Sequence, residues 1–154
     1  MFDEFVEILK NEKINSEYYK LVFSSRQLSK KVEPGQFLNI QIEKFQESLL
    51  LRRPFSYYRI RGNTIEILYE ILGKGTTILA AKRRGDMVRA LGPLGRPFTQ
   101  SLESKKRILI AGGVGVPPLV FLAEKVKDSP TMLIDCKSKA EVLPKSLGQP
   151  YRRL

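Results

Sequence analysis

The chain has 154 residues and a formal net charge of +11; 42% of its residues are hydrophobic and 28% are charged. This length suits one ordinary domain, or a small domain with part of a second, and the composition is that of a globular chain rather than a disordered one. With a single cysteine, Cys136, and no histidine, the chain cannot build a disulfide framework, a four-cysteine metal or iron–sulfur site, or Ser–His or His–zinc chemistry.

The sequence carries no sign of a membrane segment. No apolar run is long enough to cross a bilayer, and the first residues, MFDEFVEILK, are acidic and lack the regions of a signal peptide. We therefore expect a cytoplasmic protein without a membrane partner. The positive charge is spread in small clusters at 52–53, 82–84, 105–107 and 152–153. Nucleic acid would suit such a surface, but no recognition motif accompanies it, so we expect a solvated basic face or sites for phosphorylated cofactors.

The first part of the chain has the pattern of short β-strands separated by turn sequences such as EPGQ and RGNT. Five strands are expected, at 5–14, 18–25, 36–43, 54–61 and 64–71. Their spacing predicts an antiparallel barrel. A short helix follows in GKGTTILAAKRRGD, with Thr76 as its N-cap, residues 82–84 in its last turn and Gly85 as its stop. A further strand is expected over 86–95.

A different pattern begins after the polar stretch 96–106. An apolar strand over 107–113, a helix over 114–128 with prolines in its first turn, and a strand over 131–136 predict one unit of a parallel α/β fold. Too few residues follow Cys136, itself interpreted as a core residue, to finish a doubly wound sheet. We therefore predict two parts: an antiparallel β-barrel domain over 1–98 and a partial α/β domain over 106–154, apparently truncated.

The first of three motifs with possible chemistry lies in LLLRRPFSYYRI. Arg53, at the start of a strand, can offer a planar fork of donors to a phosphate, and Pro54 keeps the backbone extended. Phe55 supplies a flat apolar face and Ser56 a small hydroxyl group. Strand alternation directs Arg52 to the opposite side. This set suits a flavin nucleotide; an ordinary strand with a surface arginine and core aromatics is the alternative.

The second motif is GKGTT, one strand further on. Gly73 and Gly75 let the backbone approach a ligand closely, and Thr76 and Thr77 open a helix whose first N–H groups attract anions. Glycine turns before helices are common. The position of this one after the Arg53 segment means that a pyrophosphate could be held from both sides.

The third motif is AGGVGVPP. Gly112, Gly113 and Gly115 follow a predicted strand and open a helix, which is where a glycine-rich turn packs against a dinucleotide. Pro118 takes the place of the third glycine of GxGxxG, so that fingerprint is not met. A tight turn without a ligand is the alternative.

Taken in order, these motifs resemble the ferredoxin-reductase superfamily, in which a flavin-binding barrel precedes a nicotinamide-binding α/β domain. Within it, they resemble most the family of electron-transfer subunits of type B dihydroorotate dehydrogenases. RRPFS is similar to the RxYS flavin motif with Phe55 in the tyrosine place, ILYEILGKGTTIL and GDMVRALGPLG are similar to the segments that follow, and AGGVGVPPLVFLA is similar to the GGxGxxP nicotinamide motif.

The resemblance implies an oxidoreductase subunit with FAD as its cofactor. It would pass electrons between a nicotinamide nucleotide, NAD, and the FMN-containing catalytic subunit of dihydroorotate dehydrogenase in pyrimidine biosynthesis. A 2Fe-2S cluster relays these electrons in the family, but its cysteines lie near the end of a longer chain, so we expect no cluster here and an incomplete electron route. Hydride transfer depends on positioning, and no catalytic acid–base residue is expected.

The resemblance also implies the cofactor-binding residues. Arg53 would contact the FAD phosphates, Phe55 would pack on the flavin or ribityl chain, and Ser56 would reach the N5 region. The glycines and threonines of the second motif would hold the pyrophosphate, and the third motif would line the nicotinamide cleft. The full set is Arg53, Pro54, Phe55, Ser56, Leu68, Tyr69, Gly73, Gly75, Thr76, Thr77, Gly112, Gly113, Gly115 and Pro118. Two alternatives stay open: a non-catalytic flavin-barrel docking module, or an electron-transfer subunit of another ferredoxin-reductase-like complex.

Overall fold

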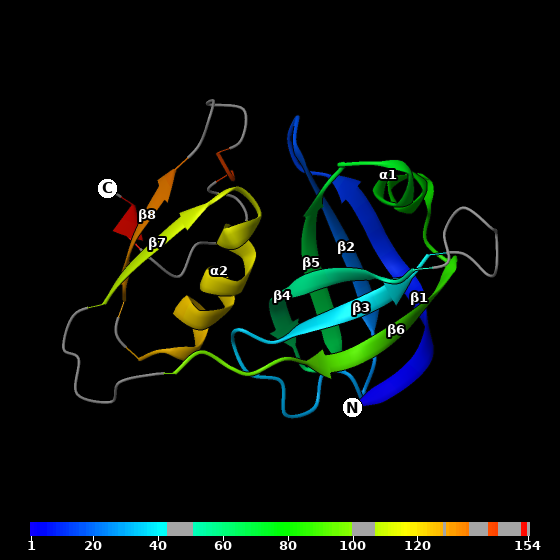
Figure 1. The fold of residues 1–154 in the computed structure, drawn as a ribbon, viewed down its shortest axis with the longest axis horizontal. Coiled ribbons are helices and arrows are strands. Elements are labelled where there is room, and N and C mark those ends of the chain that lie inside the picture. The colour runs from blue at the N-terminus through cyan, green and yellow to red at the C-terminus, as the bar shows by residue number, and fades with distance from the viewer. Residues whose placement is uncertain (43–50, 100–106, 128, 136–141, 145–151, 154) are drawn as a thin grey trace.

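A computed structural model of the chain describes residues 1–42, 51–99, 107–127, 129–135, 142–144 and 152–153. They form two lobes, a β-barrel and a smaller α/β lobe, with one helix lying between the barrel and the small sheet (Figure 1). Within these ranges, no helix is both long and apolar enough to span a membrane.

The barrel consists of six antiparallel strands that close on themselves, which confirms the predicted architecture. The strands follow the order β1-β2-β5-β4-β3-β6 around the barrel. Alternate apolar side chains such as Ile8, Phe23, Ile40 and Ile67 point inward and are fully buried. Their bounds are β1 Phe2–Lys13, β2 Tyr18–Ser24, β3 Phe37–Gln41, β4 Arg53–Arg61, β5 Thr64–Glu70 and β6 Met87–Leu94.

Helix α1, Lys74–Ala81, connects β5 to β6. The N-cap residue is Gly73 and not Thr76, which lies in the third helical position; the Thr76 hydroxyl group still accepts a hydrogen bond from the Gly73 N–H at the start of the helix. The helix also ends earlier than expected: Lys82 has an extended backbone, so the basic residues 82–84 lie outside the last turn. Gly85 adopts φ +93° beyond the helix, in the turn to β6, where its N–H donates to the carbonyl of Ile8 at 2.9 Å.

The second lobe confirms the predicted strand–helix–strand unit. Its elements are β7 Ile108–Gly112, a 3₁₀ turn Gly113–Gly115, α2 Val116–Lys125, β8 Thr131–Asp135 and β9 Arg152–Arg153. The three strands are parallel in the order β7-β8-β9. Strand β9 was not predicted, because a strand of two residues is too short to show an alternating pattern in the sequence. Cys136 lies outside the described residues.

The two faces of the small sheet differ. Leu109, Ala111 and Met132 are buried in a core that they share with α2. On the other face, Ile108 and Ile110 are 66% and 73% exposed. In a doubly wound fold helices cover both faces of the sheet; among the described residues of this lobe, a helix covers one face.

The lobes share a second hydrophobic core. Tyr18, Tyr58 and Leu68 from the barrel cluster with Val116 and Val120 from α2. A buried ion pair crosses the same contact: the Nε atom of Arg59 in β4 lies 2.6 Å from Oε1 of Glu124 in α2. The guanidinium of Arg59 also lies 4.7 Å from the centre of the Tyr58 ring. The two lobes are therefore held together by packing and by charge.

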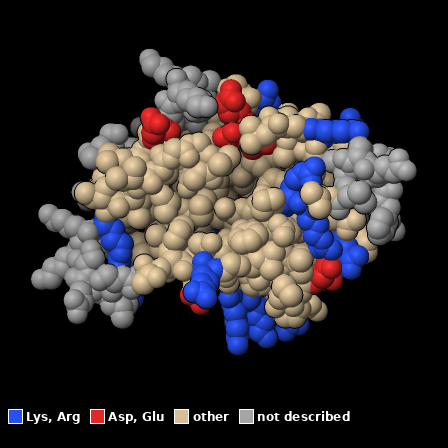
Figure 2. All heavy atoms as spheres, in the orientation of Figure 1, with Lys and Arg blue, Asp and Glu red and all other residues tan. Residues whose placement is uncertain are grey.

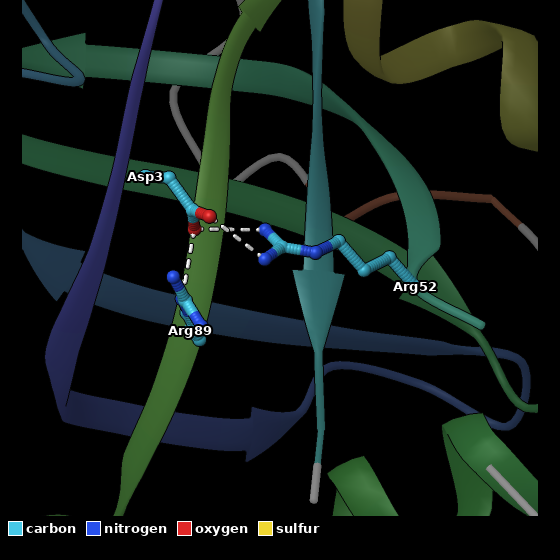
Figure 3. Close-up of polar contacts among 3 residues, drawn as sticks. All are labelled: Asp3, Arg52 and Arg89. Atoms are coloured by element: carbon cyan, nitrogen blue, oxygen red, sulfur yellow. Dashed lines mark hydrogen bonds and ion pairs between the residues drawn. The ribbon is translucent and has the colours of Figure 1, made fainter. Parts of the chain in front are cut away.

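Charged side chains are dispersed over the surface. Figure 2 shows basic side chains mainly on the lower and right parts of one face and acidic ones mainly at its top, with a few of each sign elsewhere and uncharged surface between them. On the barrel, Arg52 donates two hydrogen bonds of 2.9 Å to the carboxylate of Asp3, and Arg89 donates one of 3.1 Å (Figure 3). The hydrogen bond from Arg52 is the main cause of the lowered pKa of Asp3.

Candidate functional site

A pocket of about 620 Å³ opens between the barrel and the glycine-rich turn of the second lobe. Strands β4 and β5 and the start of α1 supply most of its wall. Of the expected site residues, it is lined by Arg53, Pro54, Phe55, Ser56, Leu68, Tyr69, Gly73, Gly75 and Thr76. The structure thus brings together the first two motifs, which are separate in the sequence.

One wall of the pocket is aromatic. Phe55 and Tyr69 are buried, and their rings meet edge to face with centroids 5.8 Å apart. The Tyr69 ring also lies 5.8 Å from that of Tyr19. Burial raises the pKa of the Tyr69 hydroxyl group above its usual range. The wall therefore offers flat apolar faces of the kind that a planar ring system packs against.

The pocket also has a cationic lining residue, Arg53. The guanidinium of Arg53 lies against the backbone of Gly75, where a Cβ atom would come within 3.2 Å of Arg53 Nε. Arg53 Nη1 donates a hydrogen bond to the carbonyl of Leu51. A fixed positive charge thus lies beside the first turn of a helix, and both features attract phosphate. Arg52 points away, to Asp3, which confirms the expected alternation.

The loop that enters α1 is closed by its own threonines. The hydroxyl oxygen of Thr76 accepts hydrogen bonds from the N–H groups of Leu72 and Gly73 at 2.9 and 3.3 Å. The hydroxyl group of Thr77 donates to the carbonyl of Gly73 at 3.1 Å. Thr77 is exposed and does not line the pocket. Its contact shapes the loop, whereas Gly73, Gly75 and Thr76 face the pocket.

The third motif lies beside this pocket. Gly112, Gly113, Gly115 and Pro118 do not line it, but Val114 from the same turn does. Gly113 has φ +49°, and a Cβ atom there would lie 3.7 Å from Oε1 of Glu70. The glycine-rich turn is therefore next to the β5 end of the pocket, with Pro118 in the first turn of α2.

Six lining residues were missed by the sequence analysis: Gly35, Phe37, Glu70, Leu72, Lys74 and Val114. Glu70 and Lys74 carry a usable signal, because they directly follow residues already assigned to the site. Gly35 is in the EPGQ turn, where it has φ +97° and packs against Phe98. That contact is long-range and leaves no local pattern.

The donor set fits a flavin nucleotide. A flat aromatic wall, a fixed cation and a helix start with a glycine that leaves room for close approach lie in one pocket. Phe55 and Tyr69 suit the ring system, and Arg53 with Gly75 suits the phosphates. Among the described residues, no group of three or more acidic, cysteine or histidine side chains could hold a metal ion.

Comparison with known proteins places this architecture in a class. No protein-family model matches the chain. In a solved NADH-dependent reduced ferredoxin-NADP oxidoreductase, the matched fold has a TM-score of 0.82 at 24% identity and covers 97% of this chain and 55% of that one. The ferredoxin reductase of carbazole 1,9a-dioxygenase matches with a TM-score of 0.79 at 13% identity, over 99% of this chain and 49% of that one. The chain therefore has the ferredoxin-reductase fold.

Its sequence is similar to that of one family within this class. It is 40% identical over 120 residues to the electron transfer subunit of dihydroorotate dehydrogenase B (NAD(+)) from Caldanaerobacter subterraneus subsp. tengcongensis, covering 78% of this chain and 46% of that protein. It is 35% identical over 156 residues to the same subunit of Shouchella clausii, covering 96% of this chain and 58% of that protein. The chain spans about half the length of these relatives. Over the part that it spans, its sequence is similar to that of this family, which confirms the predicted resemblance.

Proposed function

We propose that this chain binds FAD in the pocket between β4, β5 and α1 and forms the flavin-bearing part of an electron-transfer subunit. The observation that carries the proposal is the contact between Arg53 and Gly75. It brings a cation to a helix start in a pocket that is also lined by the packed rings of Phe55 and Tyr69.

Each residue has a distinct part in holding this cofactor. Arg53 binds a phosphate, and Gly75 lets the pyrophosphate approach the start of α1. Phe55 and Tyr69 exclude water from the ring, and Ser56 offers a small polar group near it. When bound, FAD supplies the redox chemistry, because flavins exchange both hydride and single electrons. The chain itself supplies binding and orientation, so it needs no histidine.

The second half of the proposed route is the approach of NAD. Val114 lines the flavin pocket, and the turn around Gly113 lies beside it, so a nucleotide held at this turn would place its ring close to the flavin. Gly112, Gly115 and Pro118 would shape that cleft. The relatives carry NAD(+) in their names, which favours NAD over NADP.

We further propose that the electrons reach the catalytic subunit of a dihydroorotate dehydrogenase. The support is that the relatives are named as electron transfer subunits of that enzyme. In the family, a 2Fe-2S cluster carries the electrons between the two subunits, and we do not assign one to this chain. A docking module with the same fold, or a subunit of another reductase complex, is the second candidate.

A visible absorption spectrum of the purified chain with FAD, before and after NADH is added without oxygen, tests the proposal. We expect a flavin band with the altered shape of a protein-bound flavin. Bleaching by NADH would support both nucleotide sites, and an unbleached band would support the flavin site without the nicotinamide route. A chain that binds no FAD contradicts the proposed function and leaves the docking module.

A further inference from the structure

One side chain in β1 joins the far end of α1 to the aromatic wall of the pocket. The side-chain amide of Asn11 donates hydrogen bonds to the backbone carbonyls of Leu79 and Lys82 at 2.7 and 2.9 Å. The hydroxyl group of Tyr69 donates to Oδ1 of the same side chain at 3.0 Å. Asn11 is 68 residues from Leu79 and 58 from Tyr69 in sequence, so these contacts exist only in the folded chain.

The first contact fixes the direction of α1. The helix has eight residues, too few to be stable in water without tertiary contacts. The last carbonyls of a helix lack the usual partner four residues on. Here the Leu79 carbonyl accepts from the Lys82 N–H at 3.1 Å, and the Asn11 amide from the barrel wall adds bonds to the carbonyls of Leu79 and Lys82. Leu79 also buries its side chain in the barrel core. Because α1 is short and rigid, holding its last turn also sets the position of its first turn.

The second contact reaches the flavin wall. Tyr69 lines the pocket and packs edge to face on Phe55, while its hydroxyl group points away from Phe55 to Asn11. The same amide therefore contacts both components of the site. Its NH₂ group holds the helix that begins at the phosphate end, and its oxygen holds the ring that forms the apolar wall.

We propose that Asn11 is a positioning residue that sets the spacing between the flavin wall and the phosphate-binding helix start, and so gives the pocket its preference for FAD over flavins without a pyrophosphate. The inference rests on the proposed function. It predicts a selective effect: loosening α1 weakens the grip on the pyrophosphate but leaves the ring site intact.

Two substitutions separate the two halves of this contact. Asn11→Asp removes the donor to the helix carbonyls and places a negative charge at the negative end of α1, yet still accepts from Tyr69. Tyr69→Phe is the matched control, because it removes the contact to the wall and leaves the contact from Asn11 to the helix. Asn11→Ala, which adds no charge, is the second variant if the aspartate variant does not fold.

The measurement is the dissociation constant of FAD and of riboflavin for each variant, by quenching of flavin fluorescence, with the melting temperature of each flavin-free protein. In the Asn11 variants, we expect FAD affinity to fall about tenfold, from the loss of two hydrogen bonds to the helix. Riboflavin affinity should stay within about twofold in Asn11→Asp, which still accepts from Tyr69, whereas Asn11→Ala also frees that ring and should weaken FAD more than riboflavin. Tyr69→Phe should change the ratio of the two affinities by less than about twofold.

The outcomes distinguish the inference from the proposed function. If the Asn11 variants weaken FAD and riboflavin equally, or weaken neither, Asn11 only stabilises the fold and the inference is wrong. If the unsubstituted chain binds FAD no more tightly than riboflavin, the pocket has no such preference and the inference is again wrong. If it binds neither flavin, the proposed function fails, and the inference fails with it.

Discussion

The barrel and the α/β lobe differ in whether each strand has a hydrogen-bonded neighbour on both sides. In the barrel, six strands pair in a closed ring and the core lies inside it. In the small lobe, three strands form an open sheet with β7 at one edge and the exposed face of Ile108 and Ile110. The proposed flavin site is built almost wholly by the closed lobe, and the proposed nicotinamide site by the open one.

The small lobe packs against the barrel through its helix. Its helix α2 buries one face on the small sheet and another on the barrel, where it contacts Tyr58 and Leu68. The small lobe is therefore stabilised partly by its larger neighbour. Substitutions at the contact between the lobes should affect stability, whereas substitutions at the pocket should affect ligands.

The largest effect is expected at the ion pair between the lobes. Arg59→Ala removes a guanidinium whose side chain is 4% exposed and 2.6 Å from Glu124, which is itself 23% exposed, so we expect the loss of a hydrogen bond to a charged group to cost about 1.5–3 kcal/mol of unfolding free energy. Arg61→Ala is the control, because Arg61 faces the same carboxylate at 3.9 Å but is 66% exposed, and should cost less than about 0.5 kcal/mol. Urea unfolding measures both. Equal costs would contradict the view that the barrel orders the small lobe through this contact.

At the pocket, Arg53→Ala should lower FAD affinity about ten- to a hundredfold, from the loss of a hydrogen bond to a charged group worth about 1.5–3 kcal/mol. Arg52→Ala removes the neighbouring charge, which is bound to Asp3 on the outer face, and should leave FAD affinity within about twofold. Fluorescence titration compares them. An equal loss in both variants would indicate attraction by net charge rather than a specific phosphate contact.

A smaller effect is expected at the glycines of the helix start. In Gly75→Ala, the new methyl group would lie 3.2 Å from Arg53 Nε, so we expect it to displace the guanidinium and weaken FAD binding about threefold to tenfold. Gly73→Ala is the control, because its Cβ atom meets no atom within 4 Å and its backbone is extended. The same titration applies. If Gly73→Ala weakens FAD binding more than Gly75→Ala does, the pyrophosphate approaches the backbone at the loop and not at the helix, which contradicts the role proposed for Gly75.

The smallest effect concerns the surface of the closed lobe. The pKa of Asp3 is lowered by Arg52, so the ionised carboxylate adds stability above its ordinary pKa of 3.8, and this contribution is lost as pH falls through the lowered value. Asp3→Asn should therefore reduce unfolding free energy by about 0.5 kcal/mol at pH 7. The difference from the unsubstituted chain should shrink below pH 3.8. If the difference in unfolding free energy between Asp3→Asn and the unsubstituted chain stays the same in acid, it comes from packing and not from the charge of Asp3.

Much of the fold could be predicted from the sequence, because alternation and turn residues are local signals. The six barrel strands, the unit around α2 and the side of β4 to which Arg52 points follow from such patterns. The capping of α1 could not be predicted in the same way. Its start is set by Gly73 rather than Thr76, and its end is bound by Asn11 from a distant strand.

The candidate site likewise combines residues that local patterns predict with residues that only long-range contacts bring together. Arg53, Phe55 and Gly75 belong to motifs whose residue types indicate a phosphate or a ring, so the amino-acid sequence alone was enough to select them. Glu70 and Val114 come together only because the glycine-rich turn folds against the end of β5. Such contacts depend on how the lobes dock, which no local pattern encodes.

The shared core between the lobes has a consequence for motion. Domain closure around a ligand requires a weak interface and a hinge. Here Tyr18, Tyr58 and Leu68 are buried in one cluster with α2, and the pair between Arg59 and Glu124 crosses the same contact. The glycine-rich turn cannot swing away from the flavin pocket without exposing this core. The separation between the two proposed nucleotide sites is thus fixed when the chain folds, before any ligand arrives.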